Sequence, residues 1–537
     1  MALVKCYSPV PPYVNQHFYG VRLFRISALY VNISYQINLR ETEMPTGMER
    51  IPEQRLQKLA NIRALGIDPY PPRYLRTHSA QQAVELLAQA EQSGKIETEE
   101  ITVAGRVMAN RSMGKISFLD LQDGSGKIQL FLGKNQLDEQ SNALLKEIDI
   151  GDIVGAKGIV FRTKSSEPTI RTKILTMLSK SLQPLPEKWH GLSDVEIRYR
   201  QRYLDLISNE NVRKTFRQRS QIVSAIRRYM DGRGFLEVET PILHQEGDGA
   251  AAKPFKTHHN TLDRDLYLRI ETELHLKRLI IGGFDKVYEI GRIFRNEGIS
   301  FKHNPEFTSM ESYEAYADYN SVMEMLEQMV SSVAMEIMGT IVVPHGETTI
   351  DLKAPWQRLS FRDAITQYSG IDFVQYPTAD MLRAKMREKG INADQTSNWA
   401  HLVDDLLSTF VEPKLIQPTF LIDYPLSLSP LAKKKPGQER VVERFEAFAG
   451  GMEIANAFTE LNDPLDQRER FIQQAKDKQA EGESSTVDED FLLAMEHGMP
   501  PTGGLGVGID RLIMILTNNL SIREVILFPT LKGKAEE

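Results

Sequence analysis

The sequence predicts an α+β protein in which a small β-barrel precedes a larger domain built on an antiparallel sheet flanked by helices. Its 537 residues exceed what a single hydrophobic core usually holds, so more than one domain is expected. Five short runs of alternating apolar and polar residues between positions 101 and 183 predict strands with no helices between them. After residue 200, amphipathic helical segments and strands mix without the regular alternation that marks a parallel sheet.

Composition narrows the class of protein. With 41% apolar and 26% charged residues the chain is globular, and it has no apolar run long enough to cross a bilayer, so no membrane partner is expected. Its only cysteine, Cys6, excludes intrachain disulfides and cysteine zinc sites, and suits a reducing, cytoplasmic location. The net charge of −7 argues against indiscriminate nucleic-acid binding. Residues 101–183 nevertheless carry a net positive charge, so this part of the chain could bind a polyanion such as a nucleic acid.

The first 43 residues differ from the rest. They contain Pro-Val-Pro-Pro and no acidic residue before Glu41, and lack the apolar core and cleavage site of a secretory signal. We expect a poorly ordered extension over residues 1–43. A transit peptide and a natural start at Met44 or Met48 are the alternatives.

Residues 44–100 are expected to form a helical segment. Apolar spacing predicts one helix over 55–65, ended by Gly66 with prolines beyond, and a second helix over 80–91. The basic residues of the first helix can face nucleic acid, although a solvated helix face is the commoner explanation.

The five runs within 101–183 are separated by turns, of which Asp123-Gly124-Ser125-Gly126 is the clearest. Five strands in so short a stretch are typical of a closed barrel, and the OB-fold is the natural candidate. A proline-containing linker is predicted over 184–200. The larger domain then occupies 201–537, with helices predicted at 217–231 and 321–338.

The stretch FRNEGISFKHNPEF at 294–307 predicts a hairpin with chemically active side chains. On a strand, Arg295 and Glu297 share a face, Gly298 breaks the run, and the chain returns with His303 and Phe307. Taken alone, it can equally be a surface hairpin with an ordinary ion pair.

Four further stretches accompany it: GFLEVETPIL (234–243), PEFTSMESYEAY (305–316), FEAFAGGMEIANAFTEL (445–461) and GGLGVGIDRL (503–512). Glu311 and Tyr313 share one strand face, and Asn456, Phe458 and Glu460 share another. The glycine-rich run lacks the strand–helix–strand context of a dinucleotide site.

Together these stretches resemble the three signature motifs of class II aminoacyl-tRNA synthetases, and their details resemble the lysyl-tRNA synthetases. Motif 1 is the stretch from Gly234, motif 2 is Arg295-Asn296-Glu297, and motif 3 ends at Arg511. The resemblance runs from about Arg55 to Lys532. It implies a class II catalytic domain on residues 201–537, anticodon binding by an OB-fold at 101–183, and a homodimer. The implied reaction activates L-lysine with ATP and Mg²⁺ to lysyl-adenylate and transfers the lysyl group to tRNA(Lys).

The resemblance also assigns nucleotide roles. A planar, permanently charged guanidinium at Arg295 suits the charge that builds on the α-phosphate, and Arg511 closes the opposite face, so both are expected to be catalytic. Glu446 and Glu453 are expected to hold Mg²⁺, although without the resemblance two such carboxylates are usually solvent-exposed charges. The implied ATP-binding residues are Arg295, Glu297, His303, Phe307, Glu446, Gly508 and Arg511.

The side chains expected around lysine explain its selection. A buried ammonium needs carboxylate partners, which Glu311 and Glu460 supply, whereas an aspartate site needs cations there. The implied lysine-binding residues are Gly249, Glu273, Arg295, Glu311, Tyr313, Asn456, Phe458 and Glu460. Two positions depart from the family pattern: Gly247-Asp248-Gly249 replaces a Gly-Gly lead-in, and Lys253 stands where arginine is usual.

In the barrel, Arg111, Phe118 and Gln129 match positions that read the lysine anticodon in family members. An aromatic ring stacks on an unpaired base, and polar side chains read its edges. The alternative is that Phe118 simply belongs to the barrel core.

Two other functions are considered. A related enzyme that attaches lysine-like groups to a protein has the catalytic domain but no barrel, and a non-catalytic RNA-binding derivative would tolerate loss of the motif residues. The barrel runs argue against the first, and the presence of Arg295, Glu446, Glu453 and Arg511 argues against the second.

Overall fold

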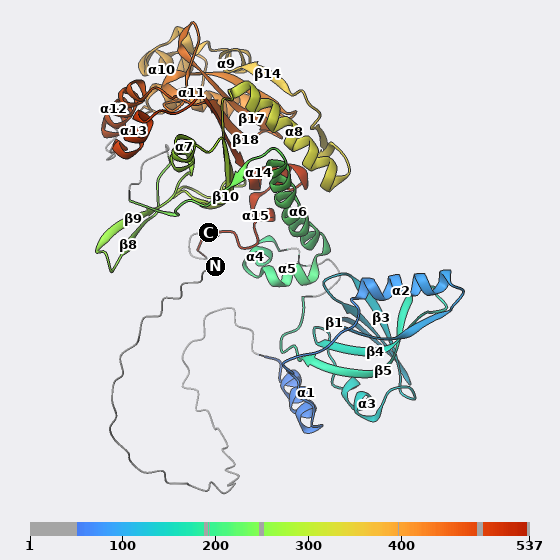
Figure 1. The fold of residues 1–537 in the computed structure, drawn as a ribbon. Coiled ribbons are helices and arrows are strands. Elements are labelled where there is room, and N and C mark those ends of the chain that lie inside the picture. Colours follow the sequence, from blue (N-terminus) through green and yellow to red (C-terminus); the bar gives the residue numbers. More distant parts are fainter. Residues whose placement is uncertain are drawn as a thin grey trace, which may run out of the picture. The chain divides into compact units, whose positions relative to one another are not determined.

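The computed structural model describes residues 51–533 except 187–191, 193, 246–251, 396 and 481–486. The described residues form two compact units, the first ending at Pro184 and the second beginning at Leu185 (Figure 1). The predicted extension 1–43 and the predicted site residue Gly249 lie outside the described residues.

The first unit is built around a closed five-stranded barrel with the strand order β1-β2-β3-β5-β4. Its strands are β1 (Glu97–Met113), β2 (Ile116–Gln122), β3 (Lys127–Gly133), β4 (Ile153–Arg162) and β5 (Pro168–Ser179). All pairs are antiparallel except β3 with β5. The barrel predicted from the five alternating runs is therefore confirmed.

Three helices accompany the barrel: α1 (Glu53–Ala64), α2 (Ala80–Gln92) and α3 (Glu139–Leu145). The first two match the predicted helices to within two residues. Ser79 caps α2 by accepting from the Gln82 backbone N–H. Ile62 of α1 and Ala83 and Leu87 of α2 are fully buried with the barrel's inward-facing residues, so the helices complete the barrel core.

The end of the predicted linker is helical and belongs to the second unit. Helix α4 (Val195–Arg200) is followed by α5 (Arg202–Ser208). Arg198 of α4 pairs with Asp205 at 3.0 Å and with Glu524 at 2.7 Å. These ion pairs hold α4 against other parts of the second unit. The prediction of a linker from proline content did not indicate this helix.

The second unit contains a nine-stranded sheet with the main strand order β14-β15-β17-β18-β19-β11-β10-β6. Its strands are β6 (Leu236–Glu237), β10 (Lys286–Phe294), β11 (Glu306–Ala315), β14 (Gln357–Ser360), β15 (Thr419–Pro425), β16 (Lys434–Lys435), β17 (Gln438–Ala449), β18 (Met452–Thr459) and β19 (Thr502–Gly508). The central pairs are antiparallel as predicted, but the outer pairs β14–β15 and β10–β6 are parallel. The sheet is therefore mixed at both edges.

Two smaller sheets complete the strands: β7 (Leu243–His244), β9 (Arg264–Leu268) and β8 (Lys256–His259) in one, and β12 (Val342–His345) with β13 (Thr348–Asp351) in the other. The remaining helices are α6 (Glu210–Gly232), α7 (Glu273–Ile281), α8 (Tyr319–Met338), α9 (Phe361–Ser369), α10 (Ala379–Glu388), α11 (Trp399–Leu406), α12 (Pro464–Ala480), α13 (Glu489–Glu496), α14 (Ile509–Leu516) and α15 (Ile522–Val525).

Helices α6, α8 and α14 cover one face of the large sheet (Figure 1). Met310 of β11, Ala455 of β18 and Val507 of β19 point into this helix-covered core. Because side chains alternate along a strand, their neighbours Glu311, Asn456 and Gly506 face the other side. Helices α9, α10 and α11 cover only the β15–β17 end of that side, which leaves its middle available for a pocket.

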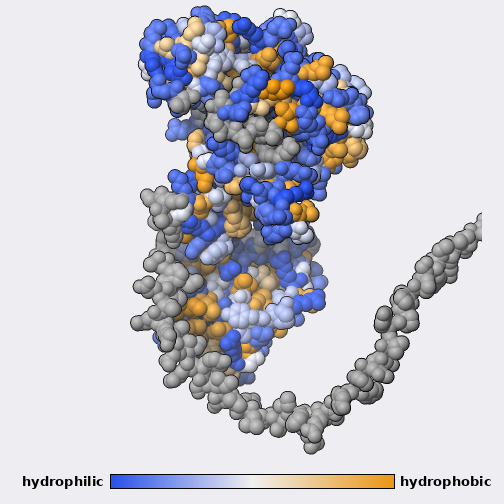
Figure 2. All heavy atoms as spheres, turned by 90° about the vertical axis from the view of Figure 1, so that its left-hand side faces the viewer, coloured by the Kyte–Doolittle hydropathy of each residue, from blue (hydrophilic) through white to orange (hydrophobic). Residues whose placement is uncertain are grey.

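No helix within the described residues is long and apolar enough to cross a membrane. On the face drawn in Figure 2, hydrophilic residues predominate over the described surface and hydrophobic residues form smaller groups among them.

Candidate functional site

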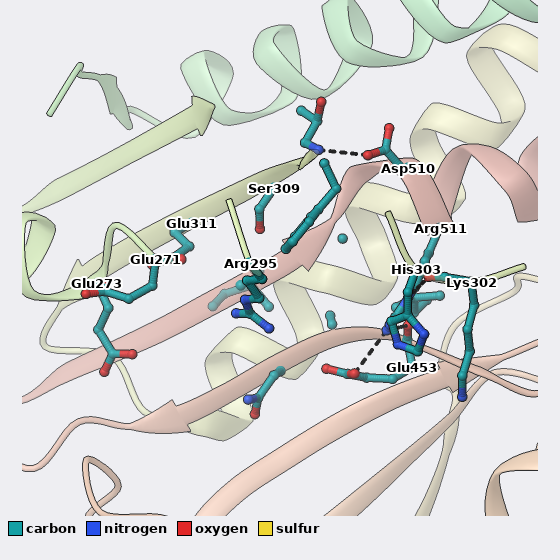
Figure 3. Close-up of a pocket in the computed structure, with 18 of the residues that line it drawn as sticks. Glu271, Glu273, Arg295, Lys302, His303, Ser309, Glu311, Glu453, Asp510 and Arg511 are labelled. Atoms are coloured by element: carbon teal, nitrogen blue, oxygen red, sulfur yellow. Dashed lines mark hydrogen bonds and ion pairs between the residues drawn. The ribbon is translucent and has the colours of Figure 1, made fainter. Parts of the chain in front are cut away.

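A pocket of about 370 Å³ lies on the open face of the sheet, over β11, β18 and β19 (Figure 3). It brings together most of the predicted site residues of the second unit: Glu273, Arg295, Glu297, His303, Phe307, Glu311, Tyr313, Glu453, Asn456, Phe458, Glu460, Gly508 and Arg511. Glu446 is not among the lining residues. Residues far apart in sequence therefore form one site.

The loop between β10 and β11 enters the pocket. Strand β10 ends at Phe294, so Arg295 and Glu297 lie in this loop. The prediction that they share a strand face is therefore wrong. Arg295 is fixed instead by its backbone N–H, which donates to Pro305 O at 2.9 Å, and by its Nε, which donates to Ile270 O at 3.3 Å. Its guanidinium points into the pocket (Figure 3), and Cζ lies 5.4 Å from the Phe307 ring centre.

One end of the pocket gathers cations. Arg511 donates to the carbonyl of Glu453 at 2.8 Å and to its Oε2 at 3.0 Å. Lys302, which sequence reasoning did not select, lines the same end and pairs with Glu412 at 2.6 Å. Burial and the charges of Arg511 and Lys302 lower the pKa of His303 to about 4, so this imidazole is neutral near pH 7. This end of the pocket therefore suits a ligand that has both an anionic group, for the cations, and an aromatic ring, for Phe307.

Asp510 positions Arg511. Its Oδ2 accepts from the backbone N–H of Thr308 at 2.7 Å, and its Oδ1 pairs with Arg219 of α6. Arg219 also donates to Thr308 Oγ1 at 3.1 Å. These contacts link the start of α14, which carries Arg511, to the start of β11, which carries Phe307.

The two predicted metal ligands lie near each other but differ in surroundings. Burial raises the pKa of Glu446 to about 7, against the effect of Arg444 and with a contribution from the charge of Glu453. Glu446 Oε1 pairs with Arg444 at 2.7 Å. Within the described part of the chain, no group of three or more His, Cys, Asp or Glu residues forms a metal cage. Two carboxylates fit Mg²⁺, which keeps several waters and shares its coordination with substrate phosphates.

At the other end of the pocket, a glycine strand forms the floor. Gly504 of β19 pairs with Tyr313 on one side and Phe458 on the other, and Gly506 pairs with Glu311 and Asn456. A Cβ at Gly504 would overlap Glu460 Oε1 and lie 2.6 Å from Tyr313 Cε1. Glycine is therefore required at position 504 because the side chains from both neighbouring strands converge above it.

A buried lysine of the chain itself supports the acidic end. Lys277 of α7, which sequence reasoning missed, is only 1% exposed and pairs with Glu273 and with Glu460 Oε2. Its Nζ also lies 5.3 Å from the Phe458 ring centre. Both carboxylate oxygens of Glu460 are buried without a hydrogen-bond partner among the described residues, although Oε2 is ion-paired with Lys277. A buried carboxylate oxygen left in this state is costly unless a ligand supplies a donor.

Glu311 and Tyr313 line the same end of the pocket as Glu460. Glu311 Oε1 accepts from the Thr272 backbone N–H, and the Tyr313 hydroxyl donates to Oε2, both at 3.3 Å. Burial, with the charge of Glu273, raises the pKa of Glu311 to about 7. A fourth carboxylate, Glu271, also lines the pocket and was not predicted. Its only sequence signal was its position two residues before Glu273.

Of the two departures noted in the sequence, Lys253 contacts the motif 2 loop through its backbone: its carbonyl accepts from Asn296 N–H at 2.7 Å. The segment Gly247-Asp248-Gly249 lies outside the described residues.

Of the predicted anticodon residues, Arg111 is exposed, Phe118 is half-buried and Gln129 is buried. Arg111 pairs across strands with Phe118 and forms two hydrogen bonds with Asp120, at 2.7 and 3.0 Å. Phe118 is half-buried and packs edge-on against Phe131 at 5.5 Å, while its neighbour Leu119 enters the core. The alternative that Phe118 is a core residue is therefore wrong.

Gln129 is more enclosed than a base-reading side chain was expected to be. It is 7% exposed, its Nε2 donates to Glu167 at 3.0 Å, and its Oε1 accepts from Thr169 at 3.1 Å. Both ends of its amide are thus held by neighbouring side chains.

Comparison with known proteins agrees with both units. Residues 194–532 match the family described as "tRNA synthetases class II (D, K and N)", and residues 101–178 match the "OB-fold nucleic acid binding domain".

The chain is also similar to curated lysine–tRNA ligases. It is 58% identical over 491 residues to that of Dehalococcoides mccartyi, covering 91% of this chain and 99% of the relative. It is 52% identical to that of Moorella thermoacetica (90% and 98%) and 49% identical to that of Halalkalibacterium halodurans (91% and 98%). With its barrel, its pocket and this near-complete coverage, the chain belongs to the lysine–tRNA ligase family of class II tRNA synthetases.

Proposed function

We propose that this chain activates L-lysine with ATP to lysyl-adenylate and transfers the lysyl group to the 3′ end of tRNA(Lys), with the pocket as its active site. One observation carries the assignment of the pocket. Glu460, whose buried carboxylate oxygens have no hydrogen-bond partner in the part of the chain that the structure describes, shares a single cavity with Arg295, so a site for a cationic side chain adjoins a site for an anion.

The acidic end is proposed to bind the side chain of lysine. Glu460 Oε1, Glu311 and the Tyr313 hydroxyl surround the ε-ammonium, whose three N–H groups need three acceptors. Phe458 packs on the aliphatic stem, while Arg295 and Asn456 hold the carboxylate. Glu273 and the Gly249 backbone bind the α-ammonium group.

The cationic end is proposed to bind ATP. Phe307 stacks on the adenine, Glu297 accepts from the adenine amino group, and the Gly508 backbone allows close approach. Arg295 contacts the α-phosphate, where negative charge builds as pyrophosphate leaves. His303 contacts the outer phosphates, and Arg511 closes the opposite face of the nucleotide. No enzyme nucleophile is required, so positioning and charge stabilisation supply the catalysis.

Mg²⁺ is proposed to bind at Glu446 and Glu453, where it would neutralise phosphate charge. Arg444 and Arg511 now pair with these two carboxylates and hold them in place. The chain's own residues therefore present the ligands without a metal.

Three further features belong to the proposal. Arg111, Phe118 and Gln129 of the barrel bind the anticodon. A second copy of the chain covers the motif 1 region, where Leu236, Ile242 and Leu243 are exposed apolar residues. The reaction takes place in the cytoplasm.

The function is tested by amino-acid-dependent exchange of pyrophosphate into ATP, measured with each of the twenty amino acids in turn. Exchange is expected with L-lysine and not with L-aspartate or L-asparagine, because the pocket end is acidic. Exchange of the same rate with all amino acids, or none with lysine, would reject the proposal.

Lysine binding is expected to weaken as the pH falls through 7. With its pKa raised to about 7, Glu311 is mostly neutral at pH 6 and mostly ionised at pH 8, and only the ionised form pairs with an ammonium. The ionisable groups around it include Glu271, Glu273, Arg295, Tyr313 and Glu460. The KM for lysine should fall about tenfold from pH 6 to pH 8. In Glu311→Gln, the KM should be high and nearly independent of pH, while the KM for ATP stays close to wild type. A pH dependence that survives this substitution would assign it to another group.

A further inference from the structure

Glu271 lies in the pocket between the segment that contacts Arg295 and the start of α7. It directly follows Ile270, whose carbonyl accepts from Arg295 Nε at 3.3 Å, and it precedes α7, which begins at Glu273. Its side chain is 7% exposed and lines the pocket between Arg295 and Glu273. In Figure 3, Glu271, Glu273 and Glu311 lie together on the same side of Arg295.

The carboxylate of Glu271 lacks a cation. Its Oε2 accepts from the backbone N–H of Leu274 at 3.3 Å, which caps the first turn of α7. Among the described residues, no Lys, Arg or His side chain forms an ion pair with Glu271 or Glu311, whereas Glu273 and Glu460 share Lys277. Burial and the charges of Glu311 and Glu273 raise the pKa of Glu271 well above its ordinary range. A helix cap needs only a neutral acceptor, so capping does not account for an acid here.

A lysine substrate has two ammonium groups, and the pocket separates the places where they fit. Glu460 Oε1, which has no hydrogen-bond partner among the described residues, lies over Gly504 beside Tyr313, and Gly504 pairs with Phe458 on the neighbouring strand. The α-ammonium is attached to the same carbon as the carboxylate that Arg295 is proposed to hold. Its partner must therefore lie beside Arg295, which is where Glu271 lies.

We propose that Glu271 is a substrate-binding residue that pairs with the α-ammonium group of lysine, in addition to Glu273. This inference rests on the proposed function. It makes the pocket selective for α-amino acids over amines or acids of the same length, because two carboxylates surround the α-ammonium.

The test compares L-lysine with 6-aminohexanoic acid, which has the same carboxylate and ε-ammonium but no α-amino group. The full chain with Glu271→Gln is assayed by pyrophosphate exchange, giving the KM for lysine and the inhibition constant of 6-aminohexanoic acid. Glutamine keeps the acceptor for Leu274 N–H and removes only the charge. We expect the KM for lysine to rise about tenfold or more, as for a lost charge-assisted hydrogen bond, and the inhibition constant to change less than twofold.

Two companion variants calibrate this result. Glu314→Gln removes a carboxylate on the same sheet that pairs with Lys286 at 2.7 Å outside the pocket, and both constants should stay at wild-type values. Glu311→Gln should weaken both ligands, because both carry the ε-ammonium. If Glu271→Gln leaves lysine unaffected, or weakens both ligands equally, the assignment of Glu271 is overturned. Failure of the wild-type chain to use lysine would instead overturn the proposed function.

Discussion

Replacing Arg295 by lysine is expected to lower kcat/KM for lysine-dependent pyrophosphate exchange by about 100- to 1000-fold, as for loss of a preorganised donor to a developing anion. Lysine keeps the positive charge but loses the planar fork, and only the fork can reach a carboxylate and a phosphate at once while donating from Nε to Ile270 O. The loss should appear mainly in kcat, measured by exchange at saturating lysine and ATP.

Arg292→Lys is the matched control for that variant. Arg292 lies three residues earlier on β10, its side chain is 43% exposed, and it contacts Glu306 at 3.7 Å. A surface pair of this kind contributes little, so exchange should stay within about twofold of wild type. Equal losses in the two variants would show that Arg295 supports the hairpin and does not act on the substrates.

Gly504→Ala is expected to raise the KM for lysine about 100-fold and to leave the KM for ATP within about threefold. The added methyl group overlaps Glu460 Oε1 and crowds Tyr313, so the acidic end must move, and losing a buried charge pair costs about 3 kcal/mol. The nucleotide end is formed by other residues. Exchange kinetics and a melting curve measure both effects.

Gly232→Ala provides the comparison for this change. A Cβ at Gly232, the last residue of α6, meets no atom within 4 Å, so both KM values should remain at wild-type levels. If Gly504→Ala raised the KM for ATP as much as that for lysine, the proposed position of the lysine side chain would be wrong.

Most helices and strands that could be predicted from the sequence were predicted from local patterns. The barrel strands and helices α1, α2, α6 and α8 were predictable because their periodicity and their turn residues are close in sequence. The parallel edge pairs were not, because β6 and β14 have two and four residues and take their direction from long-range packing. Arg295 was placed on a strand because its spacing to Glu297 fits one, whereas the backbone bond from Arg295 to Pro305 already closes the loop.

The pocket residues likewise divide into those that local patterns predict and those that depend on long-range packing. Glu311, Asn456 and Phe458 could be predicted to face one side, and the family resemblance brought their strands together. Lys277 was missed because a lysine four residues after Glu273 on a helix is indistinguishable from a solvated surface pair until its burial is known. Glu271 was missed for a related reason, since charged residues at helix starts are common in exposed positions.

Lys277 also affects how the pocket discriminates between amino acids whose side chains differ in length. Lys277 pairs with Glu460 Oε2 in the interior, so a movement of this carboxylate toward a shorter ligand would break a buried ion pair. In the proposed binding mode, ornithine is one methylene too short to contact Arg295 and Glu460 together, and a missing methylene is worth about 1–3 kcal/mol of discrimination. In that binding mode, the internal ion pair between Lys277 and Glu460 would favour lysine over its shorter homologue.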